Sequence, residues 1–141
     1  LAGSHVLPAM IRKFHDAKKS GADTVTLWGD GSPFREFLFS DDLADAVVYL
    51  MENKNAQDLE GFVNVGTGKD LAIKELAETV RSIVYEDSPS RPCVIEWDTS
   101  KPNGTPKKLL DVHRLEKLGW QAKTEFREGI RIAYQDFLAR Y

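Results

Sequence analysis

The sequence is poor in cysteine, in long hydrophobic runs and in excess positive charge. Cys93 is the single cysteine, so the chain cannot form an internal disulfide. Its apolar neighbours Val94 and Ile95 predict a buried, unreactive thiol. No apolar run approaches the ~18–20 residues that span a bilayer. The net charge is −3, which argues against nucleic acid or an anionic membrane as a partner. Together these features favour a protein of the reducing cytoplasm.

Metal-ligating and nucleophilic motifs are also absent from the sequence. The three histidines and one cysteine do not have the spacing of metal ligands. No local motif suggests a Ser-His-Asp arrangement. The pair Asp41-Asp42 resembles a catalytic carboxylate pair, but its place at a helix start predicts a role in helix initiation.

Several segments have the apolar spacing of amphipathic helices. The predicted helices are Leu7–Lys19, a helix beginning at Ser40, Ala72–Val84, a short helix from Asp111 to Gly119, and Thr124–Tyr141. Ser40 and Thr124 are the predicted N-caps of their helices. The helix that begins at Ser40 is expected to bury one stripe, formed by Leu43, Ala46, Val47 and Leu50.

Runs of β-branched and aromatic residues predict strands between these helices. The runs are Thr24–Trp28, Arg35–Phe39, Phe62–Val65 and Val94–Trp97. Phe62–Val65 is apolar almost throughout, as expected for a strand that is covered on both faces. The interleaving predicts an α/β fold, but the strands are too few for a complete doubly wound sheet. The chain also opens at Leu1 directly on a patterned segment, so we expect a fragment of a longer protein.

Three stretches resemble the extended short-chain dehydrogenase/reductase superfamily. Trp28–Gly31 followed by Arg35–Phe37 is similar to the substrate-domain hairpin of its nucleotide-sugar epimerases. Asp41–Ala44 is similar to the helix start that follows, and Phe62–Gly68 to a late parallel strand with its glycine turn. The resemblance implies the C-terminal, substrate-binding portion of an NAD(P)-binding Rossmann-like fold. Residues 1–141 would form this domain, with Phe62–Val65 and the helix after Ser40 as elements of the truncated Rossmann sheet.

Two further stretches resemble the GDP-L-fucose synthases in particular. Ser4–Phe14 is similar to the segment that holds their catalytic histidine, and Ser100–Asp111 is similar to their substrate loop. Members more usually have Asp at the position of Asn103, and often Arg at that of Lys107. The resemblance implies epimerisation and NADPH-dependent reduction of GDP-4-keto-6-deoxy-D-mannose to GDP-L-fucose.

The resemblance assigns roles to six residues. His5 would be a catalytic acid or base that also touches the nicotinamide end of the cofactor, and the ordinary histidine pKa of about 6.5 suits that work. The predicted substrate-binding residues are Lys13, Trp28, Arg35, Asn103 and Lys108. The cations would hold the diphosphate, whereas the indole would either face guanine or pack in the core. Trp97 and Trp120 are predicted to pack.

The cofactor-binding motifs of the family do not occur in this sequence. The resemblance places its GxxGxxG loop, Tyr-x-x-x-Lys motif, catalytic Ser and Cys, and dimerising helices before the present segment. Gly66-Thr67-Gly68 lacks the third glycine of a dinucleotide fingerprint. We therefore expect the 141 residues alone to be inactive and to bind no NADP(H), and the full-length enzyme to be a homodimer. The alternatives are another nucleotide-sugar epimerase, dehydratase or reductase of the superfamily, and a non-catalytic nucleotide-sugar binding module.

Overall fold

The computed structural model describes residues 5–59, 61–89 and 92–141. Ser4, which belongs to one of the predicted motifs, lies outside the described residues. The helices are α1 (Val6–Ser20), α2 (Ser40–Asn53), α3 (Ala56–Leu59), α4 (Ile73–Val84), α5 (His113–Lys117) and α6 (Phe126–Arg140). The strands are β1 (Thr24–Trp28), β2 (Phe34–Glu36), β3 (Asp70–Ala72), β4 (Val94–Asp98) and β5 (Lys107–Lys108). The predicted α/β class is confirmed, and none of the described helices is long and apolar enough to cross a membrane.

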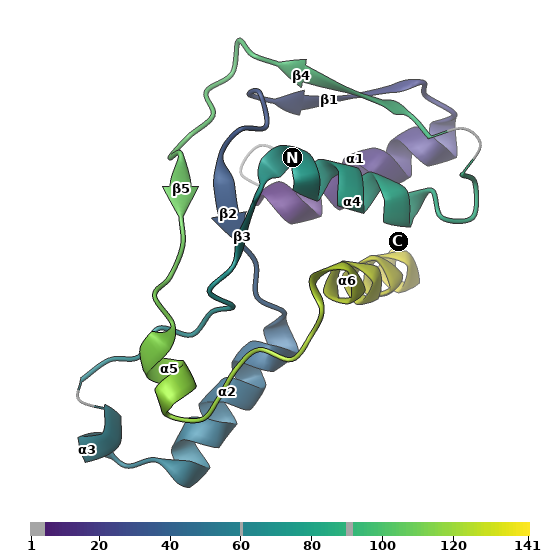
Figure 1. Ribbon diagram of the computed structural model, residues 1–141. Helices are drawn as coiled ribbons and strands as arrows, with labels where there is room; N and C mark the ends of the chain where they lie inside the picture. The colour runs from purple at the N-terminus through teal and green to yellow at the C-terminus, as the bar shows by residue number, and fades with distance from the viewer. Residues whose placement is uncertain (1–4, 60, 90–91) are drawn as a thin grey trace.

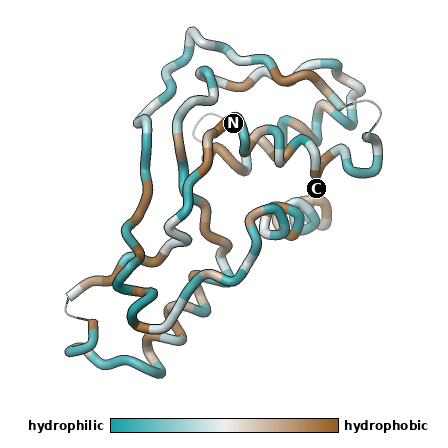
Figure 2. The backbone as a smooth tube through the Cα atoms, in the orientation of Figure 1, coloured by the Kyte–Doolittle hydropathy of each residue, from teal (hydrophilic) through white to brown (hydrophobic). Residues whose placement is uncertain are grey.

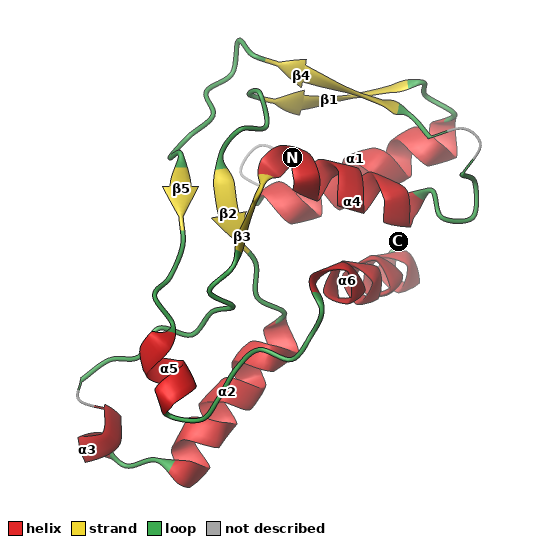
Figure 3. Cartoon of the chain, in the orientation of Figure 1, coloured by secondary structure: helices red, strands yellow, loops and turns green. Residues whose placement is uncertain are grey.

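The strands form two small sheets rather than one (Figure 3). In the first, β1 and β4 run parallel, with Thr24 opposite Val94 and Trp28 opposite Asp98. In the second, β2 is central: it is antiparallel to β3 and parallel to β5. Arg35 lies opposite Leu71 on one side and opposite Lys108 on the other.

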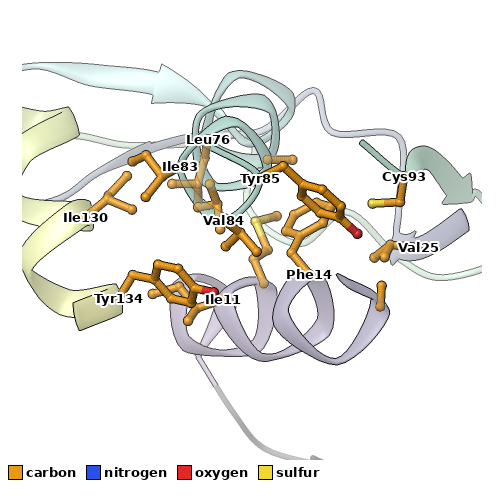
Figure 4. Packing of buried hydrophobic residues seen from close by; sticks show 14 of the residues in the cluster. Ile11, Phe14, Val25, Leu76, Ile83, Val84, Tyr85, Cys93, Ile130 and Tyr134 are labelled. Atoms are coloured by element: carbon orange, nitrogen blue, oxygen red, sulfur yellow. The ribbon is translucent and has the colours of Figure 1, made fainter. Parts of the chain in front are cut away.

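The main core lies between the β1–β4 sheet and the helices α1, α4 and α6 (Figures 1 and 4). The apolar stripes of α1 and α4 meet there, and Phe14, Leu76 and Val80 have no exposed surface. Cys93 is 2% exposed in the same core, which confirms its predicted burial. Burial also raises the pKa of the neighbouring Tyr85 to about 12, so this hydroxyl stays neutral.

A small core holds α2 and α5 together, at a distance from the main core (Figure 1). Its buried residues are Ala46, Leu115 and Trp120. The Trp120 indole donates a 2.7 Å hydrogen bond to Asp45, and this bond, with Lys123 beside it, lowers the pKa of the Asp45 carboxyl. Trp120 is therefore a packing residue, as predicted; Trp97 likewise packs against the main core.

The predicted strand at Phe62–Val65 is wrong, because the segment has an irregular backbone. Val63 and Val65 pack against the small core, but the side chain of Phe62 is 75% exposed. A strand needs a neighbour to pair its backbone groups, and among the described residues no strand lies beside this segment. Local apolar character therefore does not make it a strand here.

The predicted buried stripe of α2 is wrong for two of its four residues. Ala46 is buried and Leu50 packs against the small core, but Leu43 and Val47 are each 46% exposed. Figure 2 shows hydrophobic residues recurring along α2 although little of the described chain covers them. The cause is the same as at Phe62, because few described residues lie on that side of the helix.

The predicted helix caps Ser40 and Thr124 are replaced by Phe39 and Glu125. Glu125 accepts a hydrogen bond from the Glu128 N–H three residues on, which is the bond of an N-cap side chain. Thr124 is engaged elsewhere: its N–H and hydroxyl donate to Asp42 at 2.9 and 3.0 Å. Asp42 is 6% exposed, so it joins α2 to the entrance of α6 and is not a solvated helix-start residue.

Replacing Asp42 by alanine should lower the free energy of unfolding by about 1.5–3 kcal/mol, because two partly buried donors of Thr124 lose a charged acceptor. Urea denaturation of the variant measures this loss. Asp41→Ala is the matched control, since Asp41 is exposed on the same helical turn and should change stability by less than about 0.5 kcal/mol. Equal losses in the two variants would contradict the assigned role of Asp42.

Candidate functional site

Four of the six predicted site residues are brought together where the loop between β4 and β5 meets β1 and β2. The loop is fastened at its start, where Gly29 N donates to Asp98 O at 2.9 Å and the Ser100 hydroxyl donates to the Asp98 carboxylate. Hydrogen bonds from Ser100 lower the pKa of Asp98 and so keep it an acceptor. At its far end, Phe34 N donates to Pro106 O at 2.8 Å.

Asn103 fixes the middle of this loop to the turn after β1. Its Oδ1 accepts a 2.9 Å hydrogen bond from Asp30 N. Hydrogen bonds from Ser32, and a further one from the Asn103 side chain, lower the pKa of Asp30. Gly29 is required at this contact, because its φ is +80° and a Cβ there would lie 2.3 Å from Asn103 Oδ1. Asn103 thus has a structural role, and its contact with substrate stays a prediction.

Trp28 lies open at the end of β1 and does not pack in the core. Its side chain is 66% exposed, which settles the alternative between packing and an available surface. The Lys101 ammonium lies 5.8 Å from the centre of its ring. A cation at this distance is attracted by the face of an indole. Lys101 was not among the predicted residues, although it lies within the predicted substrate loop Ser100–Asp111.

Arg35 and Lys108 form a pair of cations on neighbouring strands. They are opposite each other in the β2–β5 pairing, and both side chains keep contact with solvent. A Cβ on Gly104 would lie 3.7 Å from the Arg35 guanidinium, so the loop passes close to that group. Within the described part of the chain, the Arg35 guanidinium donates a hydrogen bond to the adjacent Phe34 O, whereas Lys107 is paired with Asp70 at 3.2 Å. We call the set Trp28, Lys101, Arg35 and Lys108 the cation surface.

Lys13 lies on α1, and His5 lies at the start of the same helix. Lys13 reaches from α1 to β1, where its Nζ donates to Thr26 O at 2.7 Å. His5 is exposed and is the N-cap residue of α1. His5 precedes Lys13 by eight residues, which corresponds to about 12 Å along the helix axis. Trp28 follows Thr26 by two residues, which corresponds to about 7 Å along the strand. Because α1 and β1 run in opposite directions, both displacements point to the same end of the molecule (Figure 1).

The hollow beside α6 is separate from this site. It has a volume of about 750 Å³, lies between α1, the end of α4 and α6, and contains none of the predicted site residues. Four of its charged side chains are already paired, Lys18 with Asp87 and Arg131 with Glu86. Within residues 5–59, 61–89 and 92–141, no three His, Cys, Asp or Glu side chains gather as a metal site.

The turn Gly66-Thr67-Gly68 does not fit the pyrophosphate of a dinucleotide. Thr67 N and Gly68 N donate to Glu36 Oε1 at 2.6 and 2.8 Å. A Cβ on Gly66 would lie 2.4 Å from the same oxygen. A carboxylate of the chain therefore occupies the position that an anion would need, and these N–H groups are not available to NADP(H).

Comparison with known proteins agrees with this architecture. The NAD dependent epimerase/dehydratase family matches residues 2–66. A solved GDP-mannoheptose C4 reductase from Campylobacter jejuni with NADP bound superposes with a TM-score of 0.82 at 35% identity, over 96% of this chain and 45% of that one. The chain therefore has part of the Rossmann-like fold of the extended short-chain dehydrogenase/reductases.

Within that class, curated relatives confirm the resemblance to GDP-L-fucose synthases. A probable GDP-L-fucose synthase 1 of Oryza sativa subsp. japonica is 48% identical over 94% of this chain and 38% of its own length. The GDP-L-fucose synthase of Escherichia coli K12 is 43% identical over 97% of this chain and 43% of its own length. The chain therefore spans about two fifths of the curated relatives that it matches.

Proposed function

We propose that the longer protein to which this chain corresponds converts GDP-4-keto-6-deoxy-D-mannose to GDP-L-fucose. The observation that carries the proposal is the 43–48% identity to GDP-L-fucose synthases over 94–97% of the chain. The cation surface supports it, because a diphosphate needs fixed cations and a purine base needs a flat apolar face. In this proposal the described residues bind the GDP-sugar and supply one proton-transfer group.

His5 is proposed to be that proton-transfer group. Inversion at the two carbons beside the 4-keto group requires a proton to leave from one face of the sugar ring and another to return on the opposite face. His5 stands at the end of α1 that lies toward Trp28, so it can exchange a proton with a sugar held beside the cation surface. The proton acceptor or donor on the other face comes from a part of the protein outside this chain.

NADPH, when bound by the remainder of the longer protein, supplies the hydride that reduces the ketone. The N–H groups of the turn Gly66–Gly68 are already bonded to Glu36, which supports giving this turn no role in binding the pyrophosphate. In this proposal the chain contributes to the hydride step only through the predicted contact of His5 with the nicotinamide end. The homodimer and the cytoplasmic location also stay predictions. The isolated 141 residues are expected to be inactive, because the cofactor-binding motifs of the family do not occur in them.

Arg35→Ala should weaken the binding of GDP to the longer enzyme at least tenfold, which corresponds to about 1.4 kcal/mol. The reason is the loss of a guanidinium that can hold two phosphate oxygens at once. Titration calorimetry with GDP measures the change in Kd. Arg140→Ala is the control, because Arg140 is paired with Asp136 at the end of α6. A Kd equal to that of the wild type would remove Arg35 from the site.

A second candidate is a GDP-sugar reductase with a different sugar, which the likeness to the C. jejuni reductase favours. A panel of GDP- and dTDP-linked keto-deoxy sugars, tested with the longer enzyme, separates the two by turnover. A binding module without catalysis is the third alternative. Its sign would be an adjoining sequence that lacks both GxxGxxG and Tyr-x-x-x-Lys.

A further inference from the structure

We infer that Glu36 is a positioning residue, which fixes Arg35 and Lys108 at the spacing that a nucleoside diphosphate needs. The inference rests on the proposed function for the identity of the ligand, and it assigns the role to a residue that is not itself in the cation surface. Glu36 follows Arg35 directly in β2, the central strand of the three-stranded sheet.

The Glu36 carboxylate connects both edges of that sheet. On one side, Oε1 accepts hydrogen bonds from Thr67 N at 2.6 Å, Gly68 N at 2.8 Å and the Thr67 hydroxyl at 3.2 Å, just before β3 begins. On the other side, Oε2 accepts a 2.9 Å hydrogen bond from Leu110 N, just after β5 ends. One side chain therefore receives four donors from two segments far apart in the sequence.

The bond to Leu110 matters because β5 is only two residues long. The pairing with β2 joins Lys107 to Phe34 and Lys108 to Arg35, and the bond from Phe34 N to Pro106 O holds its upstream end. Downstream of Lys108, the bond from Leu110 N to Glu36 is the described hydrogen bond that continues this attachment to β2. Without it, the described hydrogen bonds between β2 and this segment would end at Lys108.

Glutamine cannot replace Glu36 in this role, although its shape is the same. Three of the four donors are backbone N–H groups, which can only donate. An amide has one acceptor oxygen, so its NH₂ group must face either Leu110 N or the pair Thr67 N and Gly68 N. In both orientations one edge of the sheet loses its connection and an N–H group faces another donor.

The test compares Glu36→Gln with Asp42→Ala in the longer enzyme. Both changes remove a carboxylate that accepts backbone N–H groups, but Asp42 joins α2 to Thr124 and does not contact the cation surface. Both variants should unfold at a lower temperature than the wild type. At a temperature well below either midpoint, the Kd for GDP should rise at least tenfold in Glu36→Gln and less than twofold in Asp42→Ala.

A role of Glu36 in stability alone would leave both Kd values unchanged, and this result would overturn the inference. If Glu36→Gln does not fold, Glu36→Asp takes its place, since the shorter carboxylate cannot reach both edges and should show the same loss of affinity. Failure of the premise that the ligand is a GDP-sugar would be distinct, because the wild type would then not bind GDP at all. Normal binding by the wild type, weaker binding by Arg35→Ala and unchanged binding by Glu36→Gln would refute only the role of Glu36.

Discussion

Replacing His5 by asparagine in the longer enzyme should lower the rate of epimerisation by about 10²–10⁴-fold, the usual contribution of a positioned proton-transfer group. Asparagine keeps the polarity of the side chain but cannot exchange a proton near neutral pH. The measurement is incorporation of deuterium from D₂O into the keto-sugar, followed by NMR without NADPH, so that proton exchange is observed apart from reduction.

Binding of GDP should be unchanged in this variant, because the diphosphate is assigned to Arg35 and Lys108. His113→Asn is the control: His113 is exposed and pairs with Asp111 at 2.7 Å, and this partner raises the pKa of the imidazole. Its loss should not affect deuterium exchange. If His5→Asn exchanged deuterium at the rate of the wild type, His5 would have no part in the mechanism.

Phe14→Ala should lower the free energy of unfolding of the 141-residue chain by about 3–5 kcal/mol. Phe14 lies on the inner face of α1, has no exposed surface and packs in the main core near Tyr85 (Figure 4). Its removal leaves a cavity between close-packed elements that can collapse only partly. Because domains of this kind are stable by about 5–15 kcal/mol, the loss is a large share of the total. Urea denaturation monitored by circular dichroism measures it.

Phe62→Ala is the matched control for that experiment. The Phe62 side chain is 75% exposed, so its truncation should change the stability of the same chain by less than about 0.5 kcal/mol. This comparison also tests the correction to the predicted strand at Phe62–Val65. A cost at Phe62 similar to that at Phe14 would mean that the segment is buried after all.

The elements that could be predicted from sequence are those whose signal is local. The helices α1, α4 and α6 each have an apolar face repeated over several turns, and all three were predicted within a few residues of their ends. β1 and β4 were found from alternation and β-branched content. These patterns depend on neighbours along the chain, so a single sequence contains them.

The elements that were missed depend on partners distant in sequence. β3 has three residues, Asp70–Ala72, and exists because it pairs with Phe34–Glu36 on a strand more than thirty residues earlier. The segment Phe62–Val65 shows the opposite error: its residues suit a buried strand, but no described strand pairs with it. The Thr124 cap failed because its hydroxyl has a competing partner, Asp42, that the local pattern did not reveal. Ser40 failed as a cap because α2 already begins at this residue.

The resemblance supplied the residues of the candidate site, but not the hydrogen bonds that hold them in place. Resemblance identified Trp28, Arg35 and Lys108, and the structure brings these residues to one surface. The parts that hold them there, the contact of Asn103 with Asp30 and the four hydrogen bonds of Glu36, join segments about 30 to 75 residues apart. A charged residue within the aromatic run Phe34–Phe39 was the available signal for Glu36, since such a position needs bonded partners.

The two cores differ greatly in size, and this difference determines which part of the molecule unfolds first. Among the residues that the structure describes, fifteen are buried in the main core and three in the small core. Local opening follows the apolar surface that a region buries, so α2 and α5 should detach while α1, α4 and the β1–β4 sheet remain folded. Such a partial opening would strain the bond from Leu110 N to Glu36, which lies two residues after Lys108. The affinity for a phosphate group would thus fall before the protein as a whole unfolds.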